Sequence, residues 1–283
     1  MRDIYLLVTH NRKKLLKHNY PTIMSDLLNI ITSSDKRRSL LLLLKDGPKT
    51  MGEIMSALSF TKTGMLPQIR ILEEKNLVKR EGKKYALTRI GQMIIKRLEP
   101  LVKTVEVIEK QEVFWQEHDI SSIPSGLLMR IDQLGDYQVI ESSIEDIYEP
   151  HKEFLDNVSK SKKLFGISPI VHPIYPDFFL ELAENGTEIS LILTQKAFNK
   201  IETEYYDKLA RGLDLKNLSF YMLDEDIKLT FVVSDIFCFT SFFLKNGVFD
   251  LRRSLVSFDK SSLLWGEELF NYYRERSKKI ENL

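Results

Sequence analysis

The stretch TKTGMLPQIRILEEKNLVKREGKKYALT, residues 61–88, decides how the first half of the chain folds. Its first part has apolar residues four and three positions apart, which predicts a helix with one apolar face: Met65, Ile69 and Leu72. Thr61 occupies the position expected for the N-cap of this helix. Pro67 lies inside the same helix and lacks a backbone N–H, so we expect a kink or a late helix start there.

A basic β-hairpin is predicted directly after this helix. Leu77-Val78 begins an extended segment, Gly82 lies in the turn, and Tyr85–Thr88 forms the returning strand. Four cations surround that single turn: Lys79, Arg80, Lys83 and Lys84. Contact with phosphates would explain this concentration of positive charge, and an ordinary solvated hairpin is the alternative.

Two further helices are predicted upstream. A helix over residues 36–45 is expected to have Asp35 as its N-cap. Thr50 caps the next helix, with Glu53 three residues later at the spacing of a capping box. The order of helix, helix, turn, helix and hairpin is that of a winged helix-turn-helix, an α+β fold, which we assign to residues 25–88.

In such a fold the third helix enters the major groove of DNA and the hairpin lies along a phosphate backbone. Arg and Gln side chains can make bidentate hydrogen bonds to guanine and adenine. The expected DNA contacts are Arg37, Arg38, Lys62, Thr63, Gln68, Arg70, Lys79, Arg80, Lys83 and Lys84. The alternative is a winged helix that binds a protein partner and leaves this face in solvent.

A long helix is expected after the hairpin, from residue 89 to about residue 118, with a kink or restart at Pro100. A helix in this place commonly pairs with its counterpart in a second subunit, so that two winged helices meet two DNA half-sites. We therefore assign residues 89–134 to a dimerisation helix and a linker, and we expect a homodimer.

The remaining residues, 135–283, alternate between strand and helix patterns, which predicts an α/β domain. The expected strands are Tyr137–Glu141, Lys163–Ser168, Glu188–Thr194, Leu218–Leu223, Lys228–Ser234 and Ile236–Leu244. The expected helices are Ile144–Lys160, Pro176–Asn185, Lys196–Leu209 and Lys260–Lys279.

Charge is distributed unevenly over the 283 residues. Residues 24–118 carry 17 Lys and Arg against 12 Asp and Glu, whereas residues 119–283 carry 19 against 27. This asymmetry favours a polyanionic partner for the first half. Residues 1–24 are a basic arm or an artefact of the chosen start site.

One cysteine, Cys238, excludes a disulfide framework and indicates a cytoplasmic compartment. No apolar run is long enough to span a membrane, so we expect no membrane partner.

The second domain holds several residues that could line a binding site. His172 and Tyr175 follow a predicted strand, where ligands bind in α/β sheets, although the surrounding prolines are equally typical of a structural loop. With His151, Asp224 and Lys228 they form our predicted effector site. No metal-ligand spacing, phosphate-binding loop or nucleophile elbow is present, so we expect no metal, no cofactor and no enzyme.

Several stretches resemble a known family. Residues 33–78 resemble the archaeal winged-helix regulators related to the ArsR and MarR types. Residues 151–154, 172–179, 224–229, 243–250 and 257–270 resemble the methanogenesis regulatory FilR-type middle domain. The resemblance implies an archaeal transcription regulator whose sensory half is similar to the phospholipase-D-like effector domains of regulators such as TrmB.

Active phospholipases of that fold use the pattern H-x-K followed by an Asp, whereas Lys152 directly follows His151 here. The resemblance therefore implies ligand binding rather than hydrolysis.

From these observations we expect a homodimeric transcription regulator that binds double-stranded DNA and responds to a small-molecule effector. The alternatives are a phosphodiesterase-like enzyme that is recruited by its winged helix, and a protein-interaction module.

Overall fold

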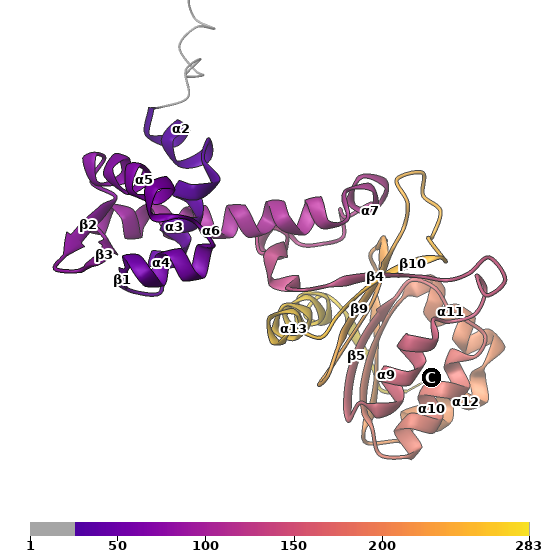
Figure 1. Cartoon of the computed structure of the whole chain (residues 1–283). Coiled ribbons are helices and arrows are strands. Elements are labelled where there is room, and N and C mark those ends of the chain that lie inside the picture. The colour runs from indigo at the N-terminus through magenta and orange to yellow at the C-terminus, as the bar shows by residue number, and fades with distance from the viewer. Residues whose placement is uncertain (1–25, 283) are drawn as a thin grey trace, which may run out of the picture. The chain divides into compact units, whose positions relative to one another are not determined.

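The computed structural model describes residues 26–282, which fall into two compact units divided between Leu101 and Val102 (Figure 1). The basic arm predicted for residues 1–24 lies outside the described residues. No helix of the described chain is long and apolar enough to cross a membrane.

In the described part of the first unit, helices pack against a small antiparallel sheet. Its elements are α2 (Asp26–Thr32), α3 (Asp35–Leu44), β1 (Lys49–Thr50), α4 (Met51–Leu58), α5 (Lys62–Glu74), β2 (Val78–Glu81), β3 (Lys84–Leu87) and the start of α6 (Arg89–Lys110). The strands lie in the order β1-β3-β2. The core contains Leu40, Leu41, Ile54, Met65 and Ile69, each at most 1% exposed, which confirms the predicted apolar face of α5.

Polar caps fix where the helices of this unit begin. The predicted capping box is present, because Thr50 Oγ1 accepts from the Glu53 N–H while the Glu53 carboxylate accepts from the Thr50 N–H. The Thr50 N–H and the Thr50 hydroxyl both donate to the Glu53 carboxylate, and these hydrogen bonds lower the pKa of Glu53. The cap of α3 is Ser34 and not Asp35 as predicted, because Ser34 Oγ accepts from the backbone N–H of Arg37.

The helices α5 and α6 each contain a proline. The helix α5 begins at Lys62, directly after its cap Thr61, so Pro67 does not delay its start. The helix α6 continues through Pro100 to Lys110 instead of restarting there. A short helix, α7 (Glu112–Glu117), follows after one residue.

The second unit is built around one mixed sheet of eight strands in the order β11-β7-β6-β5-β8-β9-β10-β4. The strands are β4 (Gln138–Glu141), β5 (Lys163–Ser168), β6 (Glu188–Thr194), β7 (Leu218–Leu223), β8 (Leu229–Ser234), β9 (Cys238–Phe242), β10 (Arg253–Ser257) and β11 (Lys278–Ile280). The neighbours β5, β6 and β7 run parallel, and the other pairs are antiparallel.

Helices cover both faces of this sheet (Figure 1). The helix α13 (Lys260–Arg274) packs on one face. The opposite face carries α9 (Lys152–Lys160), α10 (Tyr175–Glu184), α11 (Gln195–Glu204) and α12 (Tyr206–Leu213). Alternate residues of β8 point to opposite faces, because Phe231 joins the core beneath α13 and Val232 joins the other core.

Close packing of α13 depends on a glycine. A Cβ atom at Gly266 would lie 2.9 Å from both Phe231 Cζ and Val233 Cγ2. Those contacts are shorter than van der Waals packing allows, so only glycine lets the helix approach β8 this closely.

The segment expected to be a linker belongs to the core of the second unit. It forms α8 (Ser125–Leu128) and the short 3-10 helix η1 (Ile131–Leu134), with Leu127, Ile131 and Leu134 buried. The indole N–H of Trp265 donates to the Leu127 carbonyl over 3.0 Å, and the Ser257 hydroxyl donates to the Leu134 carbonyl over 2.7 Å. The glycines and serines here mark turns within a domain rather than a boundary between domains.

The α/β class of this unit is as predicted, but several elements differ. The expected helix 144–160 begins only at Lys152, and the expected helix 196–209 is divided into α11 and α12. The helix predicted to reach Lys279 ends at Arg274, because Lys278–Ile280 pairs with the edge strand β7. The sequence analysis also missed β10, whose pairing with β4 and β9 joins distant segments.

Candidate nucleic-acid interface and ligand cavity

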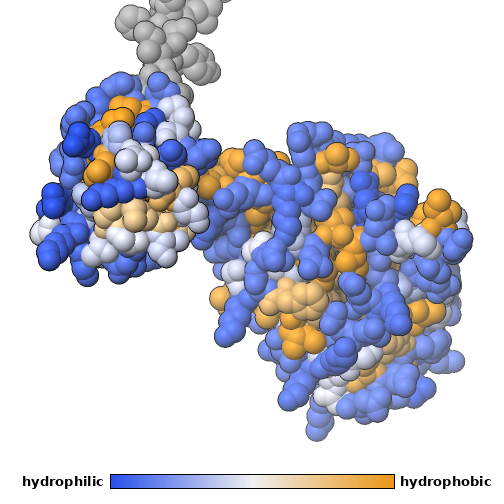
Figure 2. Space-filling view, viewed as in Figure 1, coloured by the Kyte–Doolittle hydropathy of each residue, from blue (hydrophilic) through white to orange (hydrophobic). Residues whose placement is uncertain are grey.

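The outward face of α5 is polar and accessible. Because Met65, Ile69 and Leu72 are buried, the opposite face of the helix shows Lys62, Thr63, Pro67 and Arg70, all exposed. The face visible in Figure 2 is largely hydrophilic over the first unit. The predicted reading face is therefore open to a partner.

Several cations of this unit have no internal partner. The side chains of Lys62, Arg70 and Lys83 make no hydrogen bond or ion pair within the described part of the chain, and the Lys84 ammonium is near enough to Glu53 to help lower the pKa of that carboxyl. Binding a phosphate through these groups would not break an existing ion pair. Of the other hairpin cations, Lys79 Nζ lies 2.7 Å from Glu81 Oε1 and Arg80 Nε donates to the Gly82 carbonyl over 3.0 Å.

The hairpin turn has the backbone that its sequence predicts. Gly82 has φ +60°, which a residue with a side chain rarely adopts. The register pairs Arg80 with Tyr85 and Glu81 with Lys84. The tight turn brings four basic side chains together on exposed backbone, where they could follow a line of phosphates.

Arg37 and Arg38, expected to contact DNA, use their guanidinium groups inside the unit. Arg37 Nη1 donates to Gln68 Oε1 over 2.8 Å, and its Nε donates to the Ile30 carbonyl. Arg38 pairs with Asp35 and donates to the Thr32 carbonyl over 3.2 Å. Arg37 therefore positions Gln68, whose amide nitrogen stays available.

A cavity of about 160 Å³ lies in the second unit on the face covered by α9 and α10. Its wall includes backbone and side chains from β5, β6, β8 and β9 and from the loop before α10. Most of the wall is aliphatic or aromatic. Of the five predicted effector-site residues, His151, His172 and Tyr175 line the cavity.

His151 forms part of this wall at the start of α9. Its Nδ1 lies 3.1 Å from Ser142 Oγ, and its Nε2 is buried without a hydrogen-bond partner among the described residues. Burial lowers the pKa of His151, although the nearby carboxylates of Glu153 and Asp250 oppose this shift. The ring is therefore a neutral imidazole at neutral pH.

Tyr175 and His172 lie on the loop that leads into α10. The Tyr175 ring packs near Phe154 and Phe179, and burial raises its pKa to about 12. Its hydroxyl makes no hydrogen bond within residues 26–282. In contrast, His172 Nε2 lies 2.9 Å from the Tyr148 carbonyl oxygen, so part of its bonding capacity holds the loop in place.

Asp224 and Lys228, also predicted for the effector site, do not line the cavity. Asp224 is exposed at the end of β7. Lys228 Nζ lies 2.7 Å from Asp226 Oδ2, and the Lys228 N–H donates to Ser122 Oγ. The structure places both at a polar turn, which corrects the prediction that groups all five residues.

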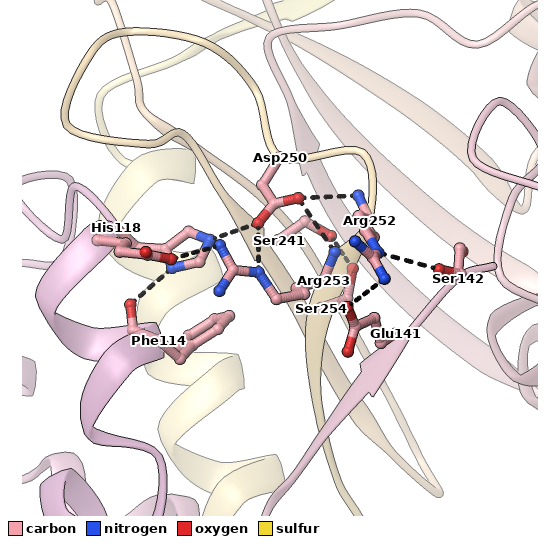
Figure 3. Close-up of polar contacts among 10 residues, drawn as sticks. Phe114, His118, Glu141, Ser142, Ser241, Asp250, Arg252, Arg253 and Ser254 are labelled. Atoms are coloured by element: carbon pink, nitrogen blue, oxygen red, sulfur yellow. Dashed lines mark hydrogen bonds and ion pairs between the residues drawn. The ribbon is translucent and has the colours of Figure 1, made fainter. Parts of the chain in front are cut away.

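Sequence reasoning missed a buried charge network beside the cavity (Figure 3). Asp250 lines the cavity, is 7% exposed, and its carboxylate accepts from His118 Nε2 over 3.0 Å and from Arg253 Nε over 2.9 Å. Desolvation raises the pKa of Asp250, but hydrogen bonds from Arg252 and Arg253 outweigh it and lower the pKa overall. Asp250 is thus held as a carboxylate.

The network reaches the end of α7. His118 is fully buried, and its Nδ1 lies 2.6 Å from the Phe114 carbonyl oxygen. Both of its ring nitrogens therefore lie within hydrogen-bonding distance of oxygen atoms. Arg253 also contacts Glu117 over 2.8 Å. No local motif signals this site, since His118 and Asp250 are 132 residues apart.

Neither Lys152 nor Asp250 offers a free charged group to the cavity. Lys152 is exposed and does not line it, and the Asp250 carboxylate is engaged by His118 and Arg253. No group of three or more His, Cys, Asp or Glu side chains in residues 26–282 is arranged to hold a metal ion.

Comparison with known proteins gives a match for each unit. Residues 25–106 match the N-terminal domain of the methanogenesis regulatory protein FilR1, and residues 147–276 match its middle domain. The FilR1 protein of Methanothrix harundinacea is 27% identical over 259 residues, which cover 90% of this chain and 58% of the relative. The chain thus spans little more than half of that relative.

Two solved structures show weaker likeness. The archaeal chromatin protein TrmBL2 has a TM-score of 0.41 at 13% identity, covering 91% of this chain and 100% of that one. The phospholipase D family member Nuc of Salmonella typhimurium has a TM-score of 0.36 at 10% identity, covering 52% and 99%. Scores this low do not establish a shared fold. The two domain matches therefore say what the chain is similar to: residues 25–106 are similar to the N-terminal domain, and residues 147–276 to the middle domain, of the methanogenesis regulatory protein FilR1.

Proposed function

We propose that this protein is a transcription regulator that binds duplex DNA through a winged helix over residues 25–88. The observation that carries the proposal is the set of exposed cations without internal partners on the outward face of α5 and at the hairpin turn. The similarity of both units to a regulatory protein supports it. In this arrangement α5 reads the major groove and the hairpin lies on phosphates.

The residues have different roles in this proposal. Lys62, Thr63 and Arg70 face the DNA directly, and Gln68 presents its amide nitrogen while Arg37 holds its oxygen. Lys83 and Lys84 contact phosphates. Of the other predicted contacts, Arg38, Lys79 and Arg80 reach phosphate only by exchanging their internal partners.

We further propose that α6 pairs with the same helix of a second copy. Apolar residues on it remain exposed at spacings of four and three, namely Leu101 (58%), Val105 (42%) and Ile108 (42%). This spacing is that of a coiled-coil seam. Apolar surface is visible along α6 in Figure 2. A dimer would bury it and present two winged helices to two half-sites.

The second unit would bind a small effector in its cavity. Asp250 could transmit effector binding to α7, because its carboxylate lines the cavity and also accepts a hydrogen bond from His118 at the end of α7. A ligand that shifts Asp250 would change the packing of α7. Regulation then requires that the ligand bind the two arrangements with different affinity.

DNA binding can be tested with the variant Lys83→Ala/Lys84→Ala. Loss of two phosphate contacts should weaken binding to all sequences and reduce the slope of log K against log salt by about 2. The measurement is fluorescence anisotropy of labelled duplexes at several salt concentrations. The matched control is Lys278→Ala/Lys279→Ala, an adjacent exposed pair in the second unit.

Equal binding and equal salt slope for the hairpin variant and the wild type would contradict the proposal. A protein that binds no duplex at low salt would contradict it more directly and favour the protein-interaction alternative.

A further inference from the structure

Most polar side chains in the cavity wall already have partners inside the protein. Ser241 Oγ and Ser254 Oγ lie 2.7 Å apart, and Ser168 Oγ donates to the Ile170 carbonyl over 2.6 Å. Asp250 accepts from His118 and Arg253. A ligand rich in hydroxyl or phosphate groups would find few groups in this wall to satisfy it, which makes burying such a ligand unfavourable.

Three polar atoms of the wall remain without hydrogen-bond partners among the described residues. His151 Nε2 and the Tyr175 hydroxyl have no hydrogen-bond partner among the described residues, and neither does the Thr230 hydroxyl. Both aromatic rings contact Phe side chains, His151 with Phe239 and Tyr175 with Phe154. A buried nitrogen without a partner is unfavourable, so a ligand group that bonds to it would be favoured.

The volume of the cavity matches a small ring compound. It measures about 160 Å³ and is bounded mainly by Leu, Ile, Val and Phe side chains. Apolar cavities of about 150 Å³ in proteins stay dry and accept molecules of the size of benzene.

We infer that the cavity binds a small, uncharged, mostly apolar molecule that carries one hydrogen-bonding group, which meets His151 and Tyr175. An anion would lie beside the Asp250 carboxylate, and the ammonium group of Lys208 in the wall is already paired with Asp177. A cation would find the Asp250 carboxylate already engaged by His118 and Arg253. This inference rests on the proposed function, since it names the class of the effector.

The test compares ring compounds that differ in one group. Binding of phenol, benzene and benzoate to the full chain is measured by isothermal titration calorimetry without DNA. Phenol should bind most tightly, benzene more weakly by roughly fivefold through loss of one hydrogen bond, and benzoate most weakly. Adding a methyl group in 4-methylphenol should tighten binding by roughly fourfold while space remains.

Variants locate the site. Val171 lines the cavity from the loop before α10, whereas Ile174 on the same loop is 39% exposed and does not line it. Val171→Trp should fill the cavity and abolish phenol binding, and the matched control Ile174→Trp should bind phenol as the wild type does. His151→Phe and Tyr175→Phe keep the ring volume and should each reduce the preference for phenol over benzene.

Tighter binding of glucose, inorganic phosphate or benzoate than of phenol would overturn the inference, and so would phenol binding that survives Val171→Trp. These outcomes leave the DNA-binding test unaffected, because no DNA is present. Conversely, if the protein bound phenol but did not bind duplex DNA, the inference would stand and the proposed function would be refuted.

Discussion

The two units of this chain use their charged side chains in opposite ways. The first unit leaves Lys62, Arg70 and Lys83 exposed without partners, whereas the second unit buries His118 and Asp250 against each other. Exposed charges contribute little to stability but attract polyanions over a distance. Buried charges contribute to one defined structure, and removal of a single partner leaves the other uncompensated.

Removing Asp250 from the buried network should therefore cause the largest change in the free energy of unfolding. Asp250→Ala should lower the free energy of unfolding of the second unit by about 3–5 kcal/mol, because it leaves His118 and Arg253 without their shared carboxylate. Both tryptophans of the sequence, Trp115 and Trp265, lie in this unit, so denaturant unfolding followed by tryptophan fluorescence reports on it.

The matched control is Asp226→Ala, since the side chain of Asp226 is 75% exposed and, among the residues that the structure describes, pairs only with Lys228. If Asp250→Ala destabilised the protein no more than this control does, the buried network would not stabilise the fold as argued.

Removing an exposed charge in the first unit should act on binding instead of folding. Arg70→Ala should weaken binding to the preferred DNA sequence by about 1–3 kcal/mol and relax the preference at one position. Tryptophan-detected unfolding should be unchanged. Titration of a set of duplexes that differ at single positions measures both affinity and preference.

Arg274→Ala, an exposed arginine in α13, is the control for the loss of one positive charge. A uniform loss of affinity across all duplexes, equal for the two variants, would assign Arg70 to nonspecific attraction rather than to base reading.

The smallest expected change in stability comes from removing the N-cap side chain of α4. Thr50→Ala removes the side-chain half of the capping box of α4 and should destabilise the first unit by about 1 kcal/mol. Circular dichroism at 222 nm is the suitable signal, because this unit contains no tryptophan. Ser56→Ala, an exposed substitution in the same helix, should be neutral or slightly stabilising. Equal destabilisation by both would show that the cap is not the cause.

The sequence predicted the first unit more completely than the second for a physical reason. Its helices are signalled within a few residues, by Thr50 with Glu53 and by Thr61 before the apolar spacing of α5. Strand pairing in the second unit joins distant segments. β10 and β11 gave no local signal, and Lys278–Ile280 becomes a strand only because β7 offers an edge to pair with.

The candidate sites follow the same division. The cationic turn Lys79–Lys84 and the polar face of α5 could be found from local patterns, because periodicity determines which side of a helix faces outward. The polar residues that line the cavity were predicted only in part from the sequence. His151, His172 and Tyr175 were predicted, but Asp250 was not, since its partners His118 and Arg253 converge on it only in the folded unit.

By itself the sequence determined the order of elements in the first unit, the position of its cations and the α/β class of the second. Tertiary structure alone decided which strands share one sheet, that residues 119–134 belong to a core, and that a small apolar cavity ends at a buried carboxylate. Helix periodicity and caps act over a few residues, whereas sheet order, cavities and buried ion pairs depend on contacts between distant parts of the chain, 132 positions apart for His118 and Asp250 and 138 for Leu127 and Trp265.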